Sequence, residues 1–227
     1  MNWGAIFDWD GVIIDSSHLH RRSWELLAHE IGRALPPDHF LRGFGMTNET
    51  ILMELLGWTR ALEVARQWSL RKEEIFRDLV RQNSIQSLPG VERWLGELSR
   101  AGVPRIIASS THRANIEMIL QRLRLPPFAG IVSAEDVTRG KPAPDIFLEA
   151  ARRLGLPPQR CVVFEDSPAG IQAGRAAGMF VVAVTTTHPA ASLPPADWVV
   201  GRLDELRVTD LEARLTQFPR PAASQSI

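Results

Sequence analysis

The sequence predicts an α/β fold, in which a parallel sheet carries helices on both faces and an α-helical cap domain is inserted after the first strand. Short apolar runs alternate with helical patterns from about residue 88 to residue 200, which is typical of such a sheet. Residues 17–84 show helical spacing with almost no strand character, and they follow one apolar run over residues 3–8. The predicted division of the chain is an α/β core over 1–16 and 87–218, a helical cap over 17–86 and a loose tail over 219–227.

Length and charge restrict the function. A chain of 227 residues fits one large domain or a core with a smaller insert. Its 26 basic and 26 acidic side chains balance, which argues against nucleic-acid binding through bulk charge. Apolar runs fall short of the roughly 18 residues that span a bilayer, and the first run already carries Asp8 and Asp10, unlike a signal peptide. We expect a cytoplasmic protein without nucleic-acid or membrane partners, and a monomer.

The core elements follow from the apolar pattern. The first strand ends in the acidic pair, and Gly11 marks a turn. After Leu88-Pro89-Gly90, helices and strands alternate. Cys161 lies in an apolar run and is expected to be buried in a strand. The predicted helices cover 91–101, 112–123, 144–154 and 168–177, and the predicted strands cover 104–108, 130–133, 160–164, 180–184 and 198–200.

The cap segment predicts three helices. Apolar residues recur at helical intervals over 24–31 and stop at Gly32. A second helix begins near Asn48 and ends at Gly57, and a third covers roughly residues 61–82. Lys72 lies in this third helix beside other charged residues, which predicts a solvated face.

Two carboxylates end the first strand. Asp8 and Asp10 are separated by one residue, so in an extended chain both project from the same side. Two such groups are hard to keep ionised without a nearby cation. The pair therefore indicates a Mg²⁺ site; a solvated strand end with two acidic turn residues is the alternative.

Other polar residues follow other strands. Ligands of open parallel sheets bind beyond the carboxyl ends of the strands. Ser109-Ser110-Thr111 follows one strand and could cradle an anion, or simply cap a helix. Glu165-Asp166 follows another, and Ser167-Pro168 is a strong helix start. Lys141, in a proline-flanked loop, would compensate the carboxylates.

Four of these segments resemble, in order, the motifs of the haloacid dehalogenase superfamily. The similarity extends from residue 3 to about residue 187. It implies a Rossmann-like core, and the helical insert resembles the cap of the subgroup that contains β-phosphoglucomutase and sugar-phosphate or phosphoglycolate phosphatases. The matching segments are Phe7–Val12, Ala108–Ser110, Gly140–Asp145 and Phe164–Gly174.

The resemblance also implies roles. Asp8 would be the nucleophile that becomes an aspartyl phosphate, and Asp10 would protonate the leaving oxygen and later deprotonate water. Ser109 and Lys141 would hold the phosphoryl oxygens. Phosphoryl transfer depends mainly on positioning and charge neutralisation, which these groups supply. A Mg²⁺ cofactor would be held by Asp8, the backbone carbonyl of Asp10, Asp166 and the adjacent Glu165.

The cap bears on the choice between phosphatase and mutase. His20 resembles a histidine that contacts the catalytic acid in the mutase. Asn48 stands where the mutase carries an arginine for a second phosphate, and a neutral amide cannot replace a guanidinium. We therefore expect a phosphatase for a small phosphorylated substrate, a sugar phosphate, with the mutase as the alternative. The candidate phosphate- or substrate-binding residues are Ser110, His20, Met46, Thr47, Asn48 and Arg77.

Further alternatives are less favoured. A dehalogenase would not need Asp10 as an acid. A phosphonate hydrolase would need a cap lysine that forms a Schiff base, and the expected solvated position of Lys72 argues against that role. The Gly-x-Gly-x-x-Gly of dinucleotide-binding enzymes does not follow the first strand. A phospho-accepting signalling or interaction domain is the alternative from another class. Hinges near 15–17 and 85–89 would let the cap close over the core.

Overall fold

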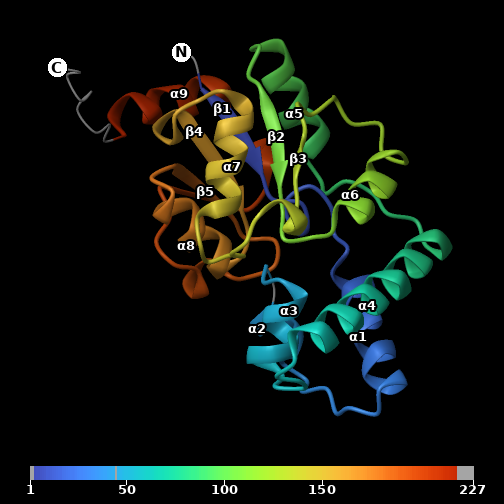
Figure 1. Ribbon diagram of the computed structural model, residues 1–227. Helices are drawn as coiled ribbons and strands as arrows, with labels where there is room; N and C mark the ends of the chain where they lie inside the picture. Colours follow the sequence, from blue (N-terminus) through green and yellow to red (C-terminus); the bar gives the residue numbers. More distant parts are fainter. Residues whose placement is uncertain (1–2, 44, 219–227) are drawn as a thin grey trace.

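A six-stranded parallel sheet forms the centre of the protein (Figure 1). The computed structural model describes residues 3–43 and 45–218, so the predicted tail over 219–227 lies outside the described residues. The strand order is β3-β2-β1-β4-β5-β6, and every neighbouring pair is parallel. The strands are β1 (Gly4–Phe7), β2 (Arg105–Ala108), β3 (Ile131–Val132), β4 (Cys161–Glu165), β5 (Phe180–Val184) and β6 (Trp198–Val200).

Helices cover both faces of the sheet, as predicted. Because side chains alternate along a strand, Phe7 and Ile6 of β1 enter two different buried clusters. The first cluster includes residues of α5 (Val91–Arg100), α6 (Arg113–Leu120) and α9 (Val208–Gln217). The second includes residues of α7 (Asp145–Leu154) and α8 (Pro168–Ala176).

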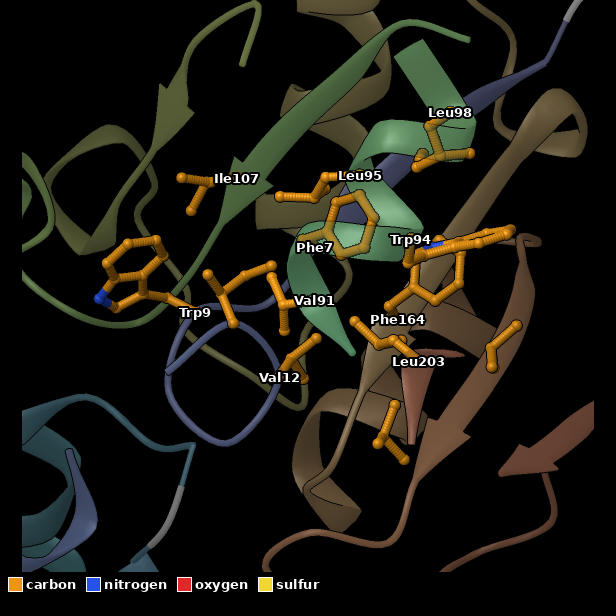
Figure 2. Packing of buried hydrophobic residues seen from close by; sticks show 14 of the residues in the cluster. Phe7, Trp9, Val12, Val91, Trp94, Leu95, Leu98, Ile107, Phe164 and Leu203 are labelled. Carbon is orange, nitrogen blue, oxygen red and sulfur yellow. The ribbon is translucent and has the colours of Figure 1, made fainter. Parts of the chain in front are cut away.

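Aromatic packing anchors the loop that follows β1. Phe7 stacks on Phe164 of β4 with ring centroids 4.5 Å apart, and Trp94 of α5 meets Phe164 edge-on at 5.9 Å (Figure 2). Trp9 and Val12 belong to the same cluster and are buried. Burial of Trp9 between the two aspartates therefore fixes the backbone from which both carboxylates project.

The cap is a separate helical layer with its own apolar core (Figure 1). Its buried residues include Trp24, Leu52 and Ile75. Across the residues that the structure describes, no helix is both long enough and apolar enough to cross a bilayer. The cap helices are α1 (Ser17–Glu30), α2 (His39–Gly43), α3 (Asn48–Thr50), which continues as a π-helical turn over Ile51–Leu55, and α4 (Leu62–Gln82).

Two helices had no counterpart in the prediction. α2 is only five residues long, so it spans little more than one turn and offers almost no periodicity. α9 buries only Leu211 and Leu215, one turn apart. Both depend on contacts with the rest of the fold rather than on a strong local pattern.

The two connections between core and cap lie side by side. The backbone N–H of Leu88 donates to the carbonyl of Ile13 at 2.8 Å, and Ile14 forms an antiparallel bridge with Ser87. These contacts adjoin the predicted hinges at 15–17 and 85–89. The exact boundaries of the cap remain a prediction.

Candidate active site

The end of β1 carries a buried ion-pair cluster. The backbone N–H of Asp8 donates to the carbonyl of Phe164 at 3.0 Å, so Asp8 is still held by the sheet. The Nζ of Lys141 donates to Asp8 Oδ1 at 2.7 Å and to Glu165 Oε1 at 2.6 Å. All three side chains are buried. The structure thus brings the predicted lysine and two of the predicted carboxylates into direct contact.

Glu165 fixes the start of α8. Its Oε2 accepts the backbone N–H groups of Asp166 and Ser167, both at 2.8 Å. Ser167 is the N-cap, accepting from Gly170 N–H at 3.1 Å, with Pro168 at the first helical position, as predicted. A Cβ on Gly170 would lie 1.7 Å from Glu165 Oε1. Glycine is required there because the carboxylate occupies that space.

Asp166 has an unsatisfied oxygen. Its Oδ2 accepts from the hydroxyl of Thr187, whereas its Oδ1 is buried without a hydrogen-bond partner. Asp8, Glu165 and Asp166 each offer an oxygen within 4.8 Å of the others. Buried polar atoms are nearly always paired, and carboxylate oxygens are the ligands that Mg²⁺ prefers. The donor set and the orphaned oxygen therefore fit a hard divalent cation.

The electrostatics of the cluster agree with this fit. Burial raises the pKa of Asp8 to about 7, although the charge of Lys141 opposes the rise. Burial, with the charges of Glu165 and Asp8, raises the pKa of Asp166 well above its usual value. Burial alone would lower the pKa of Lys141, but Asp8 and Glu165 raise it above the usual value. Three carboxylates against one ammonium leave an excess of negative charge that a divalent cation would offset.

Asp10 has different neighbours. Its Oδ2 accepts from the hydroxyl of Thr111 at 2.5 Å, and its Oδ1 accepts from the hydroxyl of Ser16. His20 of the cap places Nε2 3.5 Å from Asp10 Oδ1. Burial would raise the pKa of Asp10, but His20 and the hydroxyl hydrogen bonds lower it below the usual value. Thr111 was not assigned to the site from the sequence, although the hydroxyl run contained it.

The hydroxyl run after β2 does not cap α6. The N-cap of α6 is His112, which makes no capping hydrogen bond through its side chain. Ser109 is buried and its Oγ accepts the N–H of Thr111 at 3.3 Å. The Oγ of Ser110 donates to the carbonyl of Gly45 in the cap at 2.8 Å. These hydroxyl groups therefore do not cap α6, and the helix-capping alternative is wrong.

A cavity of about 70 Å³ lies between core and cap. Its walls include Asp8, Asp10, Ser109 and Ser110 from the core, and His20, Met46 and Asn48 from the cap.

The structure places Thr47 and Arg77 outside the walls of this cavity. Thr47 accepts Thr50 N–H at 3.3 Å as the N-cap of α3. Arg77 donates to Asn115 Oδ1 of α6 at 3.2 Å. Thr47 thus belongs to the framework of the cap, and Arg77 joins the cap to the core.

The predicted solvation of Lys72 is wrong. Lys72 is only 1% exposed and lines the cavity. Its Nζ lies 2.7 Å from His20 Nδ1 and donates to Glu73 Oε1 at 2.8 Å. The charged neighbours in sequence misled the prediction, because α4 also buries Ser69 and Phe76 at helical spacing on the same side. A cap lysine is thus present in the site, paired with a carboxylate.

The sequence also matches a known family. The family described as "Hydrolase: haloacid dehalogenase-like hydrolase" matches residues 4–178. The chain belongs to this family. The matched region contains the four segments that carried the resemblance, and it includes the helical insert.

The relatives include several phosphatases and a β-phosphoglucomutase. The chain is 39% identical over 223 residues to 5-amino-6-(5-phospho-D-ribitylamino)uracil phosphatase of Arabidopsis thaliana, covering 95% of this chain but 59% of that longer protein. It is 35% identical to hexitol phosphatase A of Escherichia coli K12, covering 91% of this chain and 94% of that one. A solved β-phosphoglucomutase from Clostridium difficile superposes with a TM-score of 0.84 at 26% identity, covering 96% and 99% of the two chains.

Proposed function

We propose that this protein is a Mg²⁺-dependent phosphohydrolase that cleaves a small phosphomonoester, a sugar phosphate, through an aspartyl phosphate on Asp8. The observation that carries the proposal is the difference in surroundings between Asp8 and Asp10 at the end of β1. Asp8 contacts Lys141 and lies in the carboxylate cluster, whereas Asp10 is held by hydroxyl groups and lies close to His20. Phosphatases among the relatives, including one named for hexitols, support the substrate class.

In the first step, a carboxylate oxygen of Asp8 attacks phosphorus and the bond from phosphorus to the ester oxygen breaks. Asp10 donates its proton to the departing alkoxide. A bound phosphate adds negative charge beside Asp10, which favours the protonated form that this step needs. Lys141 neutralises charge on the phosphoryl oxygens, and Ser109, buried at the end of β2, is placed to donate a hydrogen bond to them.

In the second step, water attacks the phosphorus of the aspartyl phosphate. Asp10, now ionised, takes the proton from that water, and the bond between Asp8 and phosphorus breaks to release inorganic phosphate. Both residues return to their starting protonation states, so the cycle balances.

The cofactor assigned to this site is Mg²⁺. Asp8, Asp166 and Glu165 would hold it, with the backbone carbonyl of Asp10 as a further ligand. It would supply positive charge that stabilises the transferring phosphoryl group.

A mutase is the second candidate, because a β-phosphoglucomutase shares the fold and the cap. Asn48 weighs against it: its Nδ2 donates to Glu73 Oε1 at 2.7 Å and lies 3.2 Å from Ser69 Oγ. No arginine occurs among the described residues that line the cavity, and the cap cation there, Lys72, is already paired with Glu73. A second phosphate on the substrate would therefore meet no free guanidinium, which favours a monophosphate.

The test measures phosphate release with Mg²⁺ across a panel of sugar phosphates, with isomerisation of β-glucose 1-phosphate followed in parallel. We expect release that Asp8→Asn abolishes, a fall of at least about 1,000-fold, because the carboxylate nucleophile is lost. Isomerisation with little release would establish the mutase instead. A folded, Mg²⁺-loaded protein that catalyses neither reaction would favour a signalling or interaction domain.

A further inference from the structure

A buried carboxylate of the cap is hydrogen-bonded to the core. Glu73 of α4 is 3% exposed, and its Oε2 accepts from the side-chain amide of Asn115 on α6. Asn115 is fully buried. Glu73 belongs to the cap and Asn115 to the core, so this hydrogen bond crosses the boundary between them.

The second oxygen of Glu73 faces the cavity wall. Its Oε1 accepts from Lys72 Nζ at 2.8 Å and from Asn48 Nδ2 at 2.7 Å. Lys72 and Asn48 both line the cavity, as does Glu73 itself. One carboxylate thus joins a core helix to two cap side chains that face the substrate space.

Asn115 is oriented by two partners of opposite kind. Its Oδ1 accepts from Arg77 at 3.2 Å, while its Nδ2 donates to Glu73. An exchange of oxygen and nitrogen would break both contacts, which fixes the amide in one orientation. Asn115 is therefore a matched donor for Glu73 rather than an accidental neighbour.

We propose that Glu73 and Asn115 form a latch that holds the cap closed and positions Asn48 and Lys72 against the substrate. This inference rests on the proposed function and on the predicted hinges near 15–17 and 85–89, about which the cap would open for substrate entry and close for reaction. In the closed state both latch groups are buried and paired. On opening, water replaces each partner, so the intact pair makes a modest favourable contribution to the closed state, whereas loss of one member leaves a buried unpaired group that disfavours closure.

Two substitutions, alone and combined, test this hydrogen bond. Asn115→Asp keeps an acceptor for Arg77 but replaces the donor to Glu73 with a second carboxylate oxygen. Glu73→Gln keeps Oε1 as an acceptor for Lys72 and Asn48, removes the charge that pairs with Lys72, and presents an N–H₂ group to the Asn115 amide. In the double variant, the amide introduced at position 73 donates to the carboxylate introduced at position 115, and the hydrogen bond is restored with the same total charge.

We expect each single variant to lower kcat/KM by about tenfold, and the double variant to recover to within about threefold of the wild type, as coupled partners do. Gln121→Glu is the matched control, because it makes the same charge change as Asn115→Asp at an exposed position just after α6. We expect no loss of kcat/KM from it. Asn115→Ala, which removes the donor without adding charge, serves if Asn115→Asp fails to fold.

A second readout does not need turnover. Hydrogen exchange of α4 and α6 in the Mg²⁺-loaded protein is expected to speed up in both single variants and to return to the wild-type rate in the double variant. Additive losses without recovery would overturn the latch while leaving phosphate release, and so the proposed function, intact. Recovery of slow exchange in a protein that releases no phosphate would support the cap–core link and overturn the proposed function.

Discussion

Asp8 and Asp10 stand two residues apart and yet have opposite surroundings. Burial raises the pKa of Asp8 to about 7, while His20 and hydroxyl hydrogen bonds overcome burial and lower that of Asp10. The difference arises because burial and the charge of Glu165 outweigh Lys141 at Asp8, whereas the cap delivers His20 to Asp10. Two identical side chains can therefore serve as nucleophile and as proton carrier.

Asp10→Asn separates these roles. p-Nitrophenyl phosphate is the substrate of choice, because its leaving group needs little protonation. With it we expect a burst of about one equivalent of p-nitrophenol. Turnover after the burst should be slowed about 100-fold or more, because the base for the second step is missing. Stopped-flow absorbance measures both phases. Steady turnover at the wild-type rate would show that Asp10 carries no proton.

At the residue scale, the sequence predicted the groups that follow strands. The alternation of side chains and the edge rule for parallel sheets placed Asp8 and Asp166 together in expectation, and the need to compensate their charge added Lys141 from its proline-flanked loop. These three residues lie within one buried cluster. Lys72 was mispredicted because its exposure depends on which face of α4 turns toward the core. That choice is made by tertiary packing, not by the local run of charges.

At the scale of the element, the first turn of α8 leaves no room for a side chain at Gly170. Gly170→Ala would place a methyl group 1.7 Å from Glu165 Oε1. We expect a loss of about 2–3 kcal/mol in the free energy of unfolding, as for an overpacked core, together with reduced activity because Glu165 contacts Lys141. Urea unfolding measures the first effect and phosphate release the second.

Gly96→Ala is the matched control in a helix interior. Gly96 lies within α5, and a Cβ there would meet nothing within 4 Å. We expect this variant to be about 0.5–1 kcal/mol more stable than the wild type and fully active, because alanine is the better helix former. Equal effects of the two substitutions would contradict the steric argument for Gly170.

The turn after β3 is held by an ionised carboxylate. Asp136 accepts from Arg153 at 2.7 Å and from Ser133 N–H at 2.8 Å. Burial would raise its pKa, but Arg153 and Ser133 hold the pKa well below the usual value. A group with a lowered folded pKa stabilises the fold above its unfolded pKa, about 3.9, and this contribution is lost as pH falls through the folded pKa.

Asp136→Asn is therefore expected to cost about 1 kcal/mol near neutral pH, a value discounted for solvent screening because the carboxylate is partly exposed. The difference from the wild type should shrink as the pH falls from about 4 toward about 3. Urea unfolding at a series of pH values measures it. A difference that stays constant down to the lowest pH would contradict an ionic origin.

For the molecule as a whole, Mg²⁺ is expected to act as a stabilising ligand. At 100 times its Kd, a ligand specific for the folded state adds about 2.7 kcal/mol to the free energy of unfolding. Asp166→Asn should remove most of this increment, because it alters the residue with the unpaired oxygen. Thermal unfolding with Mg²⁺ and with a chelator measures the effect; equal shifts in both proteins would argue against Asp166 as a ligand.

The sheet was predictable because each strand is a short apolar run with a clear end; the predicted strand over 180–184 has the observed bounds of β5. The insertion of the cap was also predictable, from the change of period after the first strand. The contacts that cross from cap to core were not. Glu73 and Asn115 are 42 residues apart, and no local pattern indicates that they meet.

The bridge between Ile14 and Ser87 has a consequence for how such proteins diversify. The chain leaves the core and returns to it at almost the same point. For the sheet, the whole cap between these two residues is therefore equivalent to one long surface loop. Long excursions in a surface loop have a small entropic effect on the remainder of a fold. A different helical segment with the same end-to-end spacing could be grafted at this junction without changing the strand register, so new specificities could be recruited by exchanging one module above an unchanged set of reacting groups.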